Sequence, residues 1–135
     1  MKYQMVCPIC TTLCNDSHED KCSGCGSTRD PIYVCWQLVK TVTLLIKLGL
    51  DVADTDMRLC TSHKMKITIR LTGAVPIAVF DGLPDGWQYI SNSHKLFSSA
   101  IESDVMINNL EQYLENKDAD GFKSVLKLAG YEIGQ

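Results

Sequence analysis

The most regular pattern in the chain is the strict alternation of apolar and polar side chains over residues 65–71, which predicts a β-strand with one apolar face. A less regular alternation over residues 50–59 predicts a second strand, and the polar residues 61–64 predict the turn that joins the two. The apolar run 75–80 and the aromatic segment 87–90 predict two further strands. Short strands so close together in sequence favour a small antiparallel sheet.

Three other segments carry a helical pattern. Residues 32–48 are apolar on all sides except for one polar stripe, which predicts a helix that is buried on most sides. Trp36 belongs to this segment and is therefore expected to be buried. Residues 103–116 and 122–129 each place apolar side chains three and four positions apart and predict two more helices. Residues 93–101 are ambiguous but would suit a helix, so the pattern as a whole predicts an α+β fold.

Composition narrows the class of protein. The chain has 135 residues, 45% of them apolar and 21% charged, which is typical of a globular protein. Its formal net charge is −3 and it has no run of lysine and arginine, so a strong non-specific grip on nucleic acid is not expected. The N-terminus lacks the apolar core of a signal peptide, and no segment predicts a membrane span. We therefore expect a cytoplasmic protein.

Seven cysteines are present, and four of them form two Cys-x-x-Cys pairs. Cys7 and Cys10 make the first pair, and Cys22 and Cys25 make the second after eleven intervening residues. Each pair can supply two thiolates from one tight turn, and four thiolates at this spacing are typical of a tetrahedral zinc site. The sequence predicts one structural Zn²⁺ bound by these cysteines, with no coordination position left open for chemistry.

These pairs resemble the zinc ribbon, a knuckle-and-hairpin module found in transcription, in translation and in many small bacterial and phage proteins. The resemblance covers roughly residues 5–28 and implies metal-ligand roles for the four paired cysteines alone. It implies a zinc-ribbon module over residues 1–28. The pattern of strands and helices predicts an α+β domain over residues 29–135, in which a small antiparallel sheet packs with about three helices. The loop between the pairs is short, which leaves little room for the long hairpins that such ribbons use on nucleic acid.

Cys14 and His18 lie inside the same loop. Either could replace one of the four thiolates or help to bind a second ion, because thiolate and imidazole are both good zinc ligands. The alternative is a spare thiol and a surface imidazole, and the spacing does not decide between the two.

Four residues around a Gly/Pro-rich loop are candidates for partner binding. Asp81 and Asp85 lie in this loop, and Trp87 and Tyr89 follow it directly. Exposed aromatic side chains beside such a loop are common contact points in protein interfaces. The alternative is that both aromatic side chains pack into the core.

Two further clusters are candidates for metal binding or catalysis. Asp51, Asp54 and Asp56 could bind a metal or a basic partner, or they could form a solvated strand edge. Cys60 and His63 could form a nucleophilic pair, but no third group supports them in sequence. The sequence therefore favours a protein that is not an enzyme.

The sequence favours a non-enzymatic, zinc-binding regulatory or adaptor protein that acts through contact with another protein. The first alternative is a nucleic-acid-binding protein associated with transcription or RNA, which the ribbon favours and the charge disfavours. The second is a small enzyme or a small-ligand-binding protein that uses the loop region 81–94.

Overall fold

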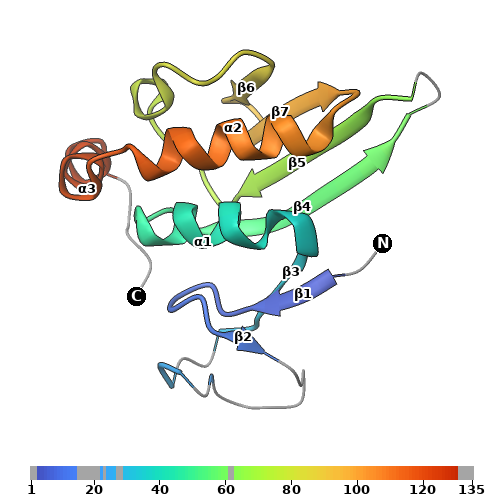
Figure 1. The fold of residues 1–135 in the computed structure, drawn as a ribbon. Helices are drawn as coiled ribbons and strands as arrows, with labels where there is room; N and C mark the ends of the chain where they lie inside the picture. The colour runs from blue at the N-terminus through green and yellow to red at the C-terminus, as the bar shows by residue number, and fades with distance from the viewer. Residues whose placement is uncertain (1–2, 15–21, 23, 27–28, 61–62, 131–135) are drawn as a thin grey trace.

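The computed structural model describes residues 3–14, 22, 24–26, 29–60 and 63–130. Within these residues it has two antiparallel β-sheets and three α-helices, joined by short 3₁₀ turns, so the α+β class is confirmed (Figure 1). None of the helices in the described part of the chain combines the length and the apolar character that crossing a membrane requires.

The N-terminal sheet has three strands in the order β2–β1–β3. The central strand β1 (Tyr3–Val6) pairs with β2 (Leu13–Cys14) on one side and β3 (Ile32–Cys35) on the other, both antiparallel. A tight turn joins β1 to β2, and it is closed by a hydrogen bond of 2.9 Å from the Cys7 N–H to the Thr12 carbonyl. This sheet therefore holds the first pair of cysteines at one of its ends.

The prediction of one helix over residues 32–48 is wrong in its first half. The segment begins as strand β3, passes through the 3₁₀ turn η1 (Trp36–Leu38) and becomes helical only in α1 (Val39–Lys47). An apolar run without clear periodicity fits a buried strand as well as a buried helix. Here the β-branched residues Ile32 and Val34 favour a strand, and β1 provides the edge with which they pair.

The second sheet has four strands in the order β4–β5–β7–β6. The hairpin of β4 (Val52–Leu59) and β5 (Met65–Leu71) matches the predicted pair of strands, and Ile67, Ile69 and Leu71 point into the core as the alternation indicated. Strand β6 (Trp87–Ile90) also matches its prediction and lies at the opposite edge of the sheet.

Two other predictions are wrong. Residues 93–101 are not helical, because β7 (Lys95–Ala100) is inserted between β5 and β6. Residues 75–80 do not form a strand, and the 3₁₀ turn η2 (Ile77–Phe80) occupies most of that run, with Pro76 at its N-cap. Proline has no N–H to donate to a sheet, so it favours a turn at this position.

Helices α1 and α2 (Ser103–Glu115) lie side by side across one face of the four-stranded sheet (Figure 1). Helix α3 (Ala119–Leu128) begins at the Asp118 cap, which accepts a hydrogen bond of 3.2 Å from the Gly121 N–H, and it packs on η2. Among the described residues, the largest fully buried side chains come from η1, α1, the sheet and the two C-terminal helices: Leu38, Leu45, Ile67, Ile69, Leu96, Leu110, Leu114 and Leu126.

The predicted architecture, a zinc ribbon followed by one small sheet, is wrong. The cysteine-rich segment contributes two strands to a three-stranded sheet, and the third strand comes from beyond the predicted module. Val6 and Val34 from this sheet belong to the same buried cluster as the inward-facing residues of the four-stranded sheet. The domain boundary between residues 28 and 29 stays a prediction, since residues 27 and 28 lie outside the described part of the chain.

Candidate metal centre

The paired cysteines lie on two tight turns at the end of the N-terminal sheet. The turn between β1 and β2 carries Cys7 and Cys10, and the segment that precedes β3 carries Cys22 and Cys25. The four sulfur atoms all lie within 4.8 Å of one another. This was the expectation from their spacing, and no other group of metal-binding side chains is found in the described part of the chain.

The distances between the sulfur atoms fit a tetrahedral metal site. The Sγ atoms of Cys7 and Cys25 are 3.8 Å apart, and those of Cys10 and Cys22 are 3.5 Å apart. A tetrahedron with Zn–S bonds of about 2.3 Å has edges of about 3.8 Å. A disulfide would require about 2.05 Å. Both distances are therefore close to the edge of such a tetrahedron and far from the length of a disulfide bond.

The described residues of the two turns form matching hydrogen bonds. The Ile9 N–H lies 3.4 Å from the Cys7 Sγ, and the Gly24 N–H lies 3.3 Å from the Cys22 Sγ. Four residues after its first cysteine, each turn reaches a left-handed residue, Thr11 with φ 67° and Gly26 with φ 75°. The N–H of that residue donates to the carbonyl of the first cysteine, at 3.1 Å in one turn and 2.9 Å in the other.

Hydrogen bonds make two of the thiols more acidic than a free cysteine. Donation by the backbone N–H groups of Cys25 and Gly24 lowers the pKa of Cys22 to about 6. A hydrogen bond from the Thr12 hydroxyl is the main cause that lowers the pKa of Cys10. Lowered pKa values favour the thiolate, which is the form that binds metal.

Four thiolates form a soft donor set that suits zinc, and together they complete its tetrahedral coordination. Cys7 is buried and Cys25 is exposed, so the site lies at the surface with one side against the sheet. His18 and the side chain of Cys14, the alternative ligands, lie outside the described part of the structure.

The residues expected to bind a partner around the 81–86 loop differ in their exposure. Trp87 is only 5% exposed, and its indole N–H donates a hydrogen bond of 2.8 Å to the Met106 carbonyl. The hydroxyl of Tyr89 accepts a hydrogen bond of 3.1 Å from the Val75 N–H. Both aromatic side chains thus have partners inside the domain, as the core-packing alternative expected, whereas Asp81 and Asp85 are exposed.

The residues of the other two candidate clusters form hydrogen bonds or ion pairs within the fold. Cys60 and His63 lie at the tip of the β4–β5 hairpin, where the His63 N–H donates to the Cys60 carbonyl at 3.1 Å. The three aspartates of the acidic cluster each pair with an arginine: Asp51 with Arg29, Asp54 with Arg70, and Asp56 with Arg58.

The structure also reveals an exposed aromatic surface that the sequence did not predict. Tyr3 is 52% exposed, and Tyr33 and Trp36 are each 58% exposed. Tyr33 lies opposite Met5 in the β1–β3 ladder, and Tyr3 lies opposite Cys35, so both tyrosines project from the same side of the sheet. Trp36 follows Cys35 directly, where the strand turns into η1. We call these three residues the aromatic face.

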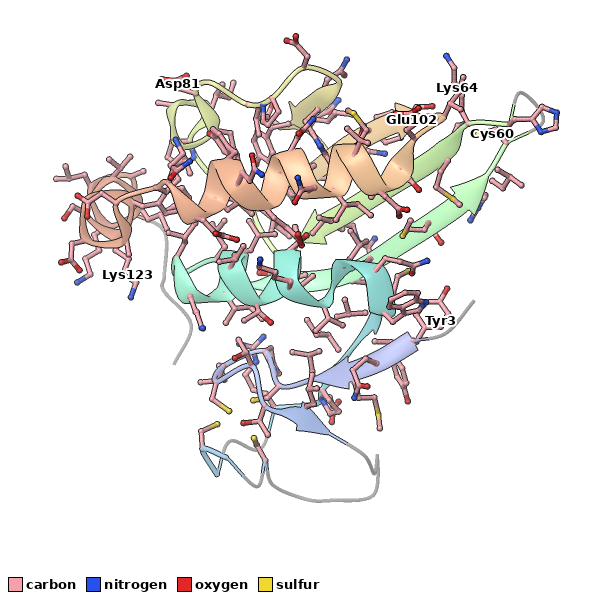
Figure 2. The ribbon with its side chains drawn as sticks, in the orientation of Figure 1. Tyr3, Cys60, Lys64, Asp81, Glu102 and Lys123 are labelled. Carbon is pink, nitrogen blue, oxygen red and sulfur yellow. The ribbon has the colours of Figure 1, made fainter. Side chains whose placement is uncertain are left out.

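Figure 2 shows Tyr3 at the outer end of β1, beside the turn from β3 into α1. The alternation of Tyr33 with Ile32 and Val34 was the available sequence signal, but it was hidden inside a run that also fitted a helix.

Comparison with protein-family models, with curated proteins and with solved structures finds no match to this chain.

Proposed function

We propose that the chain is a non-enzymatic, zinc-binding adaptor or regulatory protein that acts through contact with another protein. Cys7, Cys10, Cys22 and Cys25 hold one structural Zn²⁺ in this proposal. The observation that carries it is the approach of all four sulfur atoms to within 4.8 Å of one another.

A structural role for the zinc is supported by the donor set. Four protein thiolates fill the coordination sphere and leave no position for water or substrate. By binding all four thiolates, the ion would crosslink residues that are far apart in sequence. The crosslink would lie at the end of a sheet whose strand β2 has only two residues. So small a sheet gains stability from a metal crosslink, because metal binding contributes directly to folding free energy.

A role in protein contact is supported by the aromatic face. Tyrosine and tryptophan are enriched at the energetic centres of interfaces, because they bury large apolar areas and keep a polar group for hydrogen bonding. Tyr33 and Trp36 are each 58% exposed, although Val34 and Cys35 between them are fully buried. Because both tyrosines lie on paired strands, a partner can bind them without ordering a flexible loop.

Binding to nucleic acid is the second candidate, and one observation favours it. On the side of the four-stranded sheet that faces away from the helices, the Lys95 Nζ lies 5.7 Å from the centre of the Phe97 ring, and Lys66 is exposed on the neighbouring strand. Cations next to an aromatic ring on a sheet are used to bind single strands. A gel shift with single-stranded RNA tests this, because such binding must weaken steeply with salt.

The contact role is tested by affinity capture from the native host with Tyr33→Ala and Trp36→Ala variants. Leu128→Ala is the matched control, since Leu128 is 89% exposed on α3 and lies outside the aromatic face. We expect a protein that is recovered with the wild type and the control and lost with both aromatic variants. Equal recovery with all four proteins would rule out the aromatic face as the contact surface.

A further inference from the structure

A groove runs between η1 and helix α2, next to the aromatic face. Its volume is about 190 Å³. Trp36 forms one wall and joins the groove to the aromatic face, and α2 forms the other wall through positions that share one side of the helix. The lining residues are Trp36, Gln37, Asp104, Ile107, Asn108 and Glu111.

The charged groups that line this groove are hydrogen-bond acceptors. Asp104 and Glu111 contribute carboxylates at two ends of the same helical side. Neither carboxylate belongs to an ion pair formed within the described residues, whereas the neighbouring Glu115 is paired with Lys40 at 2.9 Å. The groove thus has two carboxylates that no ion pair among the described residues neutralises.

Gln37 supplies an independent indication of a missing donor. Its side-chain oxygen is buried and receives no hydrogen bond from any described residue. A buried acceptor without a donor costs free energy, about 1–3 kcal/mol in proteins in general. Gln37 is also one of the residues that line the groove.

The pKa of Glu111 agrees with a carboxylate that the nearby positive charge does not fully stabilise. Burial raises the pKa of Glu111 above its ordinary value, and the opposing attraction of Lys40 does not cancel this effect. A cation bound in the groove would stabilise the carboxylate form and lower this pKa.

Trp36 selects among cationic groups. Its indole is exposed along the groove, and a cation over an indole face is attracted by the ring electrons. Guanidinium is planar and can stack on the ring while its N–H groups donate to a carboxylate and an amide oxygen at once. An ammonium group has neither the planar shape nor the fixed fork of donors.

We propose that the groove between η1 and α2 binds an arginine side chain of the partner protein. The guanidinium stacks on Trp36 and donates hydrogen bonds to Glu111 and to the side-chain oxygen of Gln37. This proposal rests on the proposed contact function, and it specifies the partner as a protein with an exposed, basic segment.

The test uses the zinc-loaded full chain and capped glycine–serine peptides that differ at one central residue, which is arginine, lysine or citrulline. Citrulline keeps the shape of arginine but has no charge. Binding is followed by the fluorescence of Trp36, against a constant background from Trp87, which is 5% exposed, and by amide chemical shifts of η1 and α2.

We expect saturable binding of the arginine peptide at millimolar concentration, weaker binding of the lysine peptide and none of the citrulline peptide. Glu111→Gln should weaken binding by about tenfold, as expected for the loss of one hydrogen-bonded charge pair in a partly exposed site. Asp120→Asn is the matched control, because it removes one negative charge from the exposed start of α3 and should leave binding unchanged.

Equal binding of the arginine and citrulline peptides, or unchanged binding by Glu111→Gln, would overturn the proposal. Equal binding of the lysine peptide would overturn the assignment to arginine. Zinc content is measured on the same samples, so failure of the metal proposal is seen separately from failure of the groove. Host capture with Tyr33→Ala separately tests the contact function.

Discussion

Replacing Thr55 with valine should destabilise the protein, because Thr55 joins the two sheets. Its hydroxyl accepts a hydrogen bond of 3.1 Å from the Cys35 N–H, which joins β3 of the three-stranded sheet to β4 of the four-stranded sheet. Thr55 is 8% exposed and Cys35 is fully buried. Valine keeps the shape and the β-branching of threonine but cannot accept the hydrogen bond.

The expected loss of stability comes from the Cys35 N–H, which stays buried when its acceptor is removed. A buried N–H that loses its only acceptor costs about 1–3 kcal/mol, and water cannot replace an acceptor at a position with no exposed area. The gain from burying one more methyl group offsets part of this, and we expect a net loss of about 1–2 kcal/mol. For a chain of this size that corresponds to a fall in melting temperature of roughly 4–8 °C.

The assay is urea denaturation of the zinc-loaded protein, with Thr55→Ser as the control. Serine keeps the hydroxyl and loses a methyl group, so it should be destabilised less than valine. Far-UV circular dichroism and Trp87 fluorescence should report the same midpoint if the two sheets unfold together. A Thr55→Val protein as stable as the wild type, or more stable than Thr55→Ser, would refute the view that this bond joins the sheets.

Three further predictions concern the metal site, the core and the groove. Gly24→Ala should weaken zinc affinity, measured by chelator competition, since the added Cβ would collide with the Thr12 hydroxyl and lie 3.1 Å from the Cys10 Sγ; unchanged affinity would contradict the tight packing of this turn. Trp87→Phe should lower stability by about 1–2 kcal/mol in urea denaturation, because the Met106 carbonyl loses its indole donor; an unchanged midpoint would argue against this bond. The raised pKa of Glu111 means that stability is greatest below its ordinary pKa and falls as pH rises through the raised value, so Glu111→Gln should flatten the stability–pH profile in that range; a profile identical to wild type would contradict the assignment.

Some elements could be predicted because local sequence decides them. The strand over 65–71 was predicted at its observed bounds, since its alternation fixes which side chains enter the core. Helix α2 begins at the predicted Ser103 and ends one residue before the predicted end. The approach of the four cysteines was also predictable, because their spacing is set by the needs of tetrahedral coordination.

The errors arose where a distant partner decides the structure. Residues 95–100 form a strand because β5 and β6 offer hydrogen-bonding edges on both sides, which no local pattern reveals. Residues 32–35 pair with β1 for the same reason, and this places Trp36 on the surface rather than inside a helix. The aromatic face and the groove both depend on this turn, so neither could be predicted while 32–48 was interpreted as one helix.

The central claim is that four thiolates bind one zinc ion that stabilises the fold. It is tested most directly by elemental analysis of the purified wild-type protein and of Cys22→Ser, measured in parallel. The account predicts about one zinc per wild-type chain and a large loss of zinc in Cys22→Ser. A folded wild-type protein without stoichiometric metal, or a Cys22→Ser protein that keeps its zinc, would contradict it.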